Sequence, residues 1–195
     1  QDQAQPDGSS TPKKSAAAKP KTRRNGSTRS TPADTAGASS SLASTSASAS
    51  TAAPKTELAT FGAGCFWHVE DTFEHLKGVK NAVSGYSGGH IAYPSYEMVH
   101  TGETGHAEVV QVEYDPSVIS YEDLLKIFWR SHDPTSINRQ GEDEGPQYRS
   151  VIFFHSEAQR KAALKSYEQL TRARAFRGPI VTQLAPMRAF FPAED

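Results

Sequence analysis

The sequence predicts an α+β domain of two layers, preceded by a disordered N-terminal tail. In residues 57–195, short apolar runs that end at glycines alternate with segments whose apolar residues recur at helical spacing. At least one pair of neighbouring predicted strands has no helix between its members, which favours an α+β arrangement over a strictly alternating parallel sheet. Residues 1–56, in contrast, carry almost no side chain that could enter a core.

Residues 1–56 consist mainly of Ser, Ala, Thr, Pro, Gly and basic residues, with Leu42 as the only large aliphatic residue and no aromatic residue. Such a segment buries too little apolar surface to offset the entropy cost of ordering, so we expect disorder. It holds eight Lys or Arg and three Asp, a net charge of +5; the whole chain has −1, so residues 57–195 carry −6. A basic arm on an acidic domain can contact nucleic acid or an anionic surface, but because no aromatic residue lies between the charges, we favour a solubilising tail.

The first predicted elements surround the only cysteine. Residues 57–64 form a short apolar run broken by glycines, which predicts a strand. Residues 66–76 predict a helix, because their apolar residues recur at helical spacing: Phe66, Val69, Phe73 and Leu76. Cys65 therefore falls at or near the first turn of this helix.

Two further strands are predicted at residues 79–89 and 106–116, the second from its clear alternation of apolar and polar residues. The stretch 84–108 is rich in Gly, Tyr and His and lacks periodicity. Loops of that length inside a compact domain are usually functional, so we expect this loop to contribute to a site.

The C-terminal part predicts two helices among further strands. Residues 120–133 predict a helix with Ser120 as a capping-box-like start, and residues 156–170 predict another with Ser156 as its N-cap. The remaining apolar runs predict one strand at residues 148–156 and one or two closing strands at residues 179–193.

Membrane and metal functions are not expected. The chain has no run of about 18 apolar residues and no apolar signal segment before the tail. We expect a cytoplasmic location, with a processed or exported form as the alternative because the chain begins with Gln. One cysteine excludes an internal disulfide and a cysteine-rich zinc site, and the seven histidines lack a metal-ligand spacing.

Cys65, in the sequence GAGCFW, has two competing interpretations. A thiolate is a nucleophile, and a helix N-terminus lowers the pKa of a cysteine by stabilising negative charge. A lone cysteine is also commonly a buried, inert residue. The flanking glycines and the predicted helix start favour the reactive interpretation. Phe66 and Trp67 follow directly and face different sides of the helix, so we expect them to be buried to different extents.

Glu108 is the candidate proton donor. It begins a predicted strand after a glycine loop, and a carboxyl group near aromatic side chains has a raised pKa. The alternative is a solvent-exposed glutamate at a strand start. For the neighbouring His106, a loop or supporting role is favoured over that of a base. Tyr96 and Tyr148 can donate hydrogen bonds to a substrate oxygen, or can simply pack with satisfied hydroxyls.

Taken together, these segments resemble a known family. GAGCFWHVE, GYSGG and the run from YPSYEMVHTGETGHAE to QYRSVIFF are similar in order and spacing to the A-type peptide methionine sulfoxide reductases, over about residues 57–192. The resemblance implies a ferredoxin-like α+β sandwich with a mixed sheet. It also implies reduction of the S epimer of methionine sulfoxide, free or within proteins, to methionine, as a repair of oxidised proteins.

The resemblance implies a role for each candidate residue. The nucleophile falls on Cys65, which becomes a sulfenic acid. The acid that protonates the sulfoxide oxygen falls on Glu108, and the hydrogen-bonding tyrosines fall on Tyr96 and Tyr148. The implied substrate-binding residues are an aromatic pair and an aspartate: Phe66, Trp67 and Asp143.

Two departures from the family pattern affect the expectations. His68 stands where the family most often has Gly, and we expect it to point outward without effect. Family members commonly continue past FFPAED with resolving cysteines, whereas this sequence has one cysteine. Either the sequence is truncated, or the sulfenic acid of Cys65 is reduced directly by an external thiol of thioredoxin or of glutathione with glutaredoxin. We expect no bound cofactor and a monomer.

Two other function classes compete with the reductase. A catalytically silent domain would bind oxidised methionine or a partner surface, but it has no need for the combination of a cysteine, a glutamate and two tyrosines. A cysteine hydrolase would pair Cys65 with His68, but no oxyanion-hole or orienting motif accompanies them. A substrate test separates the three classes.

Overall fold

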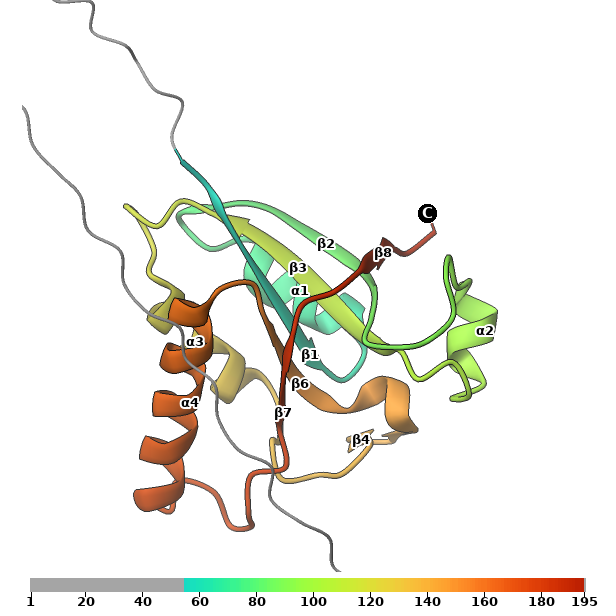
Figure 1. Ribbon diagram of the computed structural model, residues 1–195. Coiled ribbons are helices and arrows are strands. Elements are labelled where there is room, and N and C mark those ends of the chain that lie inside the picture. The colour runs from blue at the N-terminus through green and yellow to red at the C-terminus, as the bar shows by residue number, and fades with distance from the viewer. Residues whose placement is uncertain (1–54, 195) are drawn as a thin grey trace, which may run out of the picture. The chain divides into compact units, whose positions relative to one another are not determined.

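The computed structural model describes residues 55–194 of the protein (Figure 1). The predicted disorder of residues 1–56 therefore lies outside the described residues, except for Lys55 and Thr56. The main elements are β1 (Glu57–Ala63), α1 (Phe66–Glu74), β2 (Val79–Ser87), α2 (Tyr96–His100), β3 (Ala107–Tyr114), α3 (Tyr121–Ser131), β6 (Ser150–Phe154), α4 (Glu157–Arg172), β7 (Gln183–Pro186) and β8 (Phe190–Pro192). Between α3 and β6 lie β4 (Arg139–Gln140), β5 (Asp143–Glu144) and the 3-10 helix η1 (Pro146–Tyr148).

A six-stranded sheet in the order β7-β6-β1-β3-β2-β8 forms the centre of the domain. The β6–β7 pair is parallel and the other neighbouring pairs are antiparallel, so the sheet is mixed as expected. The four inner strands, in the order β6-β1-β3-β2, follow the chain order β-α-β-β-α-β through α1 and α3. This is the ferredoxin-like arrangement, so the predicted fold class is confirmed. Strands β7 and β8 extend the sheet at its two edges.

Helices α1, α3 and α4 share one large apolar cluster with one face of the sheet. Alternate residues of a strand point to the same face, so one set of strand side chains meets all three helices. Phe61 of β1 lies at the centre of this cluster, with its ring 5.2 Å from the ring of Phe73 and 5.2 Å from the ring of Phe128. The opposite face carries a smaller apolar cluster around Val109 and Phe153. The domain therefore has the two predicted layers.

Both predicted helix caps are confirmed. Ser120 Oγ accepts the backbone N–H of Asp123 at 3.1 Å, and Ser156 Oγ accepts the backbone N–H of Gln159 at 3.2 Å. The capping box at α3 is only half formed, because the Asp123 carboxylate accepts the Ser120 hydroxyl at 2.8 Å. A complete box needs a longer side chain that returns to the backbone N–H of the cap residue.

The structure contains short elements that the sequence did not indicate. Helix α2 lies within residues 84–108, which were predicted to be a loop, and Ser95 caps it by accepting the N–H of Met98 at 3.3 Å. The β4–β5 hairpin and η1 were also not predicted. Each of these elements is too short to show a hydrophobic period. No helix within residues 55–194 is long and apolar enough to cross a membrane.

Candidate active site

Cys65 is the N-cap residue of α1 and follows a glycine turn. Gly64 has a φ of +94°, a left-handed conformation that favours glycine, and a Cβ at this position would lie 2.7 Å from the side chain of Gln140. The turn brings the chain from β1 into α1 and leaves the thiol partly exposed. The backbone N–H groups of Trp67 and His68 lie at the helix start and act on the thiol by lowering its pKa.

Glu108 lies beside Cys65 because β3 pairs with β1. Phe61 faces Val110 in the register of the two strands, so the end of β1 meets the start of β3. Glu108 is 2% exposed, and its Oε2 accepts the N–H of Phe66 at 3.1 Å. Burial raises the pKa of the Glu108 carboxyl to about 7; the Phe66 N–H opposes this, and the charge of Asp143 adds to it. A carboxyl group that is partly protonated at neutral pH can act as a general acid.

The pKa of the Cys65 thiol is set by opposing effects. Burial raises this pKa above its ordinary value, and the charges of Glu108 and Asp143 raise it further. The N–H groups of Trp67 and His68 lower it without offsetting these effects. The helix start therefore lowers the pKa as predicted, but desolvation of the thiolate outweighs this effect and the net shift is upward. Protonation of Glu108 removes a nearby negative charge and so favours the thiolate.

Four rings form an aromatic wall next to the thiol: Phe66, Trp67, Tyr86 and Tyr96. The ring of Phe66 lies 5.8 Å from that of Trp67, 5.7 Å from that of Tyr86 and 6.5 Å from that of Tyr96. The rings of Trp67 and Tyr96 stack at 6.4 Å. As predicted, the pair after the cysteine is buried unequally, with Phe66 2% and Trp67 66% exposed. The wall borders a cavity of about 560 Å³.

Tyr148 and Asp143 come from the segment between α3 and β6. Burial raises the pKa of Tyr148 to about 12, and Glu108, Tyr96, Asp143 and Cys65 add to this shift. Burial also raises the pKa of Tyr96, with contributions from Glu108, Cys65 and Asp143. These mutual effects mean that the groups lie near one another. The structure thus brings all seven predicted site residues together, while their individual roles remain predictions.

Tyr86 and Glu194 belong to the same region and were not singled out from the sequence. Tyr86 is fully buried and its hydroxyl donates to Glu194 Oε2 at 3.2 Å, while Glu194 Oε1 accepts the N–H of Tyr96 at 2.9 Å. Glu194 therefore links β2 to the first turn of α2 and holds two rings of the wall against Phe66. An aromatic residue within GYSGG was the available signal for Tyr86. Glu194 gave no signal, because its contacts depend on the return of the chain to β2.

Comparison with known proteins identifies the family. Residues 57–195 match the family model described as peptide methionine sulfoxide reductase. The chain belongs to this family. It is therefore an oxidoreductase, like its relatives, the peptide methionine sulfoxide reductases MsrA. The relative from Methanosarcina acetivorans is 56% identical over 139 residues, which cover 71% of this chain and 74% of the relative. The relative from Geobacter metallireducens is 54% identical over 142 residues, which cover 73% and 88%.

Solved structures of the reductase family share the fold. Mxr1 from Saccharomyces cerevisiae in reduced form aligns with a TM-score of 0.68 and 37% identity, over 72% of this chain and 81% of that chain. Methionine sulfoxide reductase A of Corynebacterium diphtheriae aligns with a TM-score of 0.64 and 33% identity, over 73% and 72%. Mxr1 in complex with Trx2 aligns with a TM-score of 0.52 and 29% identity, over 70% and 80%.

Two histidines, His106 and His68, lie near the reductase site in the sequence and differ in burial. His106 is 2% exposed; its Nδ1 accepts the N–H of Gly89 at 3.1 Å, so Nε2 carries the proton and donates to the carbonyl of Ile91 at 2.7 Å. The expected loop role of His106 is confirmed. His68 is exposed, as predicted. The Cys–His pair of a hydrolase receives no support from this arrangement.

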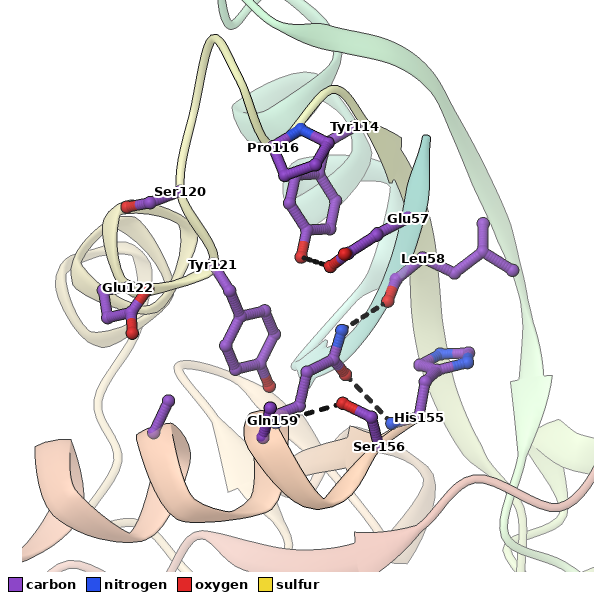
Figure 2. A pocket seen from close by; sticks show the side chains of 12 residues that line it. Glu57, Leu58, Tyr114, Pro116, Ser120, Tyr121, Glu122, His155, Ser156 and Gln159 are labelled. Atoms are coloured by element: carbon purple, nitrogen blue, oxygen red, sulfur yellow. Dashed lines mark hydrogen bonds between the residues drawn. The ribbon is translucent and has the colours of Figure 1, made fainter. Parts of the chain in front are cut away.

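A second cavity, of about 600 Å³, lies at the other end of the sheet (Figure 2). It is lined by the start of β1, by Tyr121 at the start of α3 and by Gln159 in the first turn of α4. Inside it, Tyr114 donates to Glu57 at 2.9 Å. The length of β1 separates this cavity from Cys65 by roughly 20 Å. None of the predicted site residues lines it.

The residues that the structure describes offer no metal site. Within residues 55–194, no group of three or more His, Cys, Asp or Glu is placed to hold a metal ion. The reductase site itself presents a thiol, a buried carboxyl group, two phenols and an aromatic wall.

Proposed function

We propose that the protein reduces the S epimer of methionine sulfoxide, protein-bound or free, through attack of the Cys65 thiolate on the sulfoxide sulfur. Membership of the reductase family supports the reaction class. The observation that carries the mechanism is the position of Glu108. Its carboxyl group has a pKa of about 7 and accepts a hydrogen bond from the backbone N–H of Phe66, the residue that follows Cys65.

The first half-reaction moves two electrons from Cys65 to the substrate. A sulfoxide oxygen is a poor leaving group until it is protonated, and Glu108 supplies that proton while Tyr96 and Tyr148 donate hydrogen bonds to the same oxygen. The thiolate sulfur attacks the sulfoxide sulfur and forms an S–S bond, while the S–O bond of the substrate breaks and the protonated oxygen leaves as hydroxide. Hydroxide then attacks the Cys65 sulfur, and the S–S bond breaks. The oxygen ends on Cys65 as a sulfenic acid, and methionine is released. No other reductant is needed for this half.

The aromatic wall supplies the epimer choice. The S-methyl group of the substrate has no hydrogen-bonding group, so only an apolar surface can orient it. With the methyl group against Phe66 and Trp67 and the oxygen toward Glu108, one epimer directs its sulfur at the thiolate. Asp143, which is exposed, contributes to substrate binding.

The second half-reaction returns Cys65 to its thiol. The sequence holds one cysteine, so within it no second thiol can form a disulfide with Cys65. An external thiol attacks the sulfenic acid and releases water, and a second thiol reduces the mixed disulfide. The solved complex of the related Mxr1 with Trx2 supports a thioredoxin-type reductant. Glutathione with glutaredoxin is the alternative. A cytoplasmic location, a monomeric state and repair of oxidised proteins remain predictions.

A single-turnover experiment tests this function. The enzyme is mixed without reductant with the separate S and R epimers of a blocked methionine sulfoxide, in the presence of a dimedone-type trap for sulfenic acid. We expect one equivalent of methionine from the S epimer and a trapped adduct on Cys65. Cys65→Ser, which keeps the fold but not the thiol, should form no methionine. Equal yields from both epimers, or activity of the serine variant, would contradict the proposal.

A further inference from the structure

Arg149 follows Tyr148 directly, and its guanidinium group joins three separate segments. Nη1 donates to the carbonyl of Pro146 at 2.7 Å, Nη2 donates to the carbonyl of Gly105 at 3.1 Å, and Nε donates to the side chain of Gln183 at 3.1 Å. A planar guanidinium can reach several acceptors at once because its N–H groups point in fixed directions.

The two carbonyl groups belong to the segments that carry the acid and one phenol of the site. Pro146 begins η1, and η1 ends at Tyr148. Gly105 has a φ of +73° and lies in the turn that leads into β3, three residues before Glu108. A single side chain therefore fixes the distance between the turn before Glu108 and the short helix that presents Tyr148.

The charge of Arg149 has no counter-ion among the described residues. No carboxylate oxygen within residues 55–194 forms an ion pair with it, and burial lowers the pKa of its guanidinium. Placing a cation in a partly buried position without a counter-ion is unfavourable, so its hydrogen bonds to neutral acceptors account for its position. The backbone of Gly88 also packs closely against the guanidinium group, because a Cβ on Gly88 would lie 3.1 Å from Nη2 of Arg149.

We infer that Arg149 is a positioning residue for the reduction step, which holds the turn before Glu108 and the helix of Tyr148 at the separation that lets both groups reach one sulfoxide oxygen. This inference rests on the proposed function. Arg149 touches neither the substrate nor Cys65. Its effect passes through Tyr148, and a change of about 1 Å in the position of a hydrogen-bond donor is enough to lower the rate of a chemical step.

A double-mutant cycle tests whether Arg149 acts through Tyr148. Single-turnover rates with the S epimer are measured for the wild type, Arg149→Met, Tyr148→Phe and the double variant. We expect Arg149→Met to lower the rate about tenfold with the tyrosine present and less than about twofold in the Tyr148→Phe background. Arg160→Met is the matched control, because Arg160 pairs only with Glu157 on the surface of α4, and its rate should equal that of the wild type.

The outcomes are distinguishable. Equal losses in the two backgrounds, or an unchanged rate for Arg149→Met, would overturn the positioning role while leaving the proposed function intact. A wild type that forms no methionine would instead overturn the proposed function. If circular dichroism shows that Arg149→Met does not fold, the cycle is run with Arg149→Lys, which keeps the charge and lacks the guanidinium fork. The same non-additive loss is then expected, and additive losses overturn the inference.

Discussion

Cys65 and Glu108 form a coupled pair of acids. The buried carboxylate raises the pKa of the thiol, and a thiolate in the same place would hold the proton on the carboxyl group more tightly. The protonation state of each group therefore influences the pKa of the other. The reactive arrangement, a thiolate next to a neutral carboxyl group, contains one proton for the pair. This arrangement supplies a nucleophile and an acid at the same moment.

The raised pKa of Glu108 predicts a pH-dependent stability. The folded-state pKa of about 7 exceeds the ordinary value of 4.5. The contribution of Glu108 to the free energy of unfolding is therefore fully present below pH 4.5 and is lost as the pH rises through 7. Glu108→Gln removes this loss. We compare the free energy of unfolding of the variant with that of the wild type at each pH. We expect this difference to favour the variant by up to about 3 kcal/mol more at pH 8 than at pH 4. Urea unfolding of both proteins at the two pH values measures it, and an equal difference at both would rule out the raised pKa.

The unequal burial of Phe66 and Trp67 predicts that truncations at neighbouring positions have different effects. Phe66→Ala removes a fully buried ring, and we expect a cost of about 3–4 kcal/mol in the free energy of unfolding. Trp67→Ala removes an exposed ring, so we expect less than about 1 kcal/mol but a rise of about tenfold in the KM for the S epimer. Thermal unfolding and initial rates measure both. A wild-type KM for Trp67→Ala would contradict its substrate role.

At the scale of elements, the glycine turn between β1 and α1 sets the position of the thiol. The β1–β3 register brings Glu108 to this turn, and the first N–H of α1 completes the contact. Local sequence patterns predicted these elements correctly, because helical spacing and strand alternation are visible within a few residues. The short helix α2, the β4–β5 hairpin and η1 were not predictable in this way. Their positions depend on contacts such as those of Glu194 and Arg149, which join residues far apart in the sequence.

Gly64→Ala should disturb the turn that carries the thiol. The variant combines a left-handed φ with a Cβ 2.7 Å from Gln140, so we expect a cost of about 1–3 kcal/mol and a loss of at least about tenfold in the single-turnover rate. Gly78→Ala is the matched control, since Gly78 has a φ of +101° and a similar close contact at the far end of α1. It should lose stability and keep its rate. Equal rate losses in the two variants would show that the turn has no special role.

At the scale of the whole molecule, the fold class was predictable from the sequence, whereas the electrostatics were not. The resemblance assigned seven residues that the structure brings together at the junction of β1, α1 and β3. The net shift in the pKa of Cys65 is opposite to the effect of the helix start, because the sequence shows the helix start but not the packing that removes water from the thiol. For the same reason Tyr86, Glu194 and Arg149 became apparent only in three dimensions.

The pH dependence of the single-turnover rate, in the wild type and in Glu108→Gln, tests the central claim that a buried acid works with the thiolate. For the wild type we expect the rate to rise up to about pH 7, to stay level, and to fall where the pair loses its last proton. The rate of Glu108→Gln should be lower at every pH, and its pH profile should lack the change in slope near pH 7. Its rate should increase with pH until the thiol is fully ionised. The same profile and rate in both proteins would contradict the role of Glu108 as the acid.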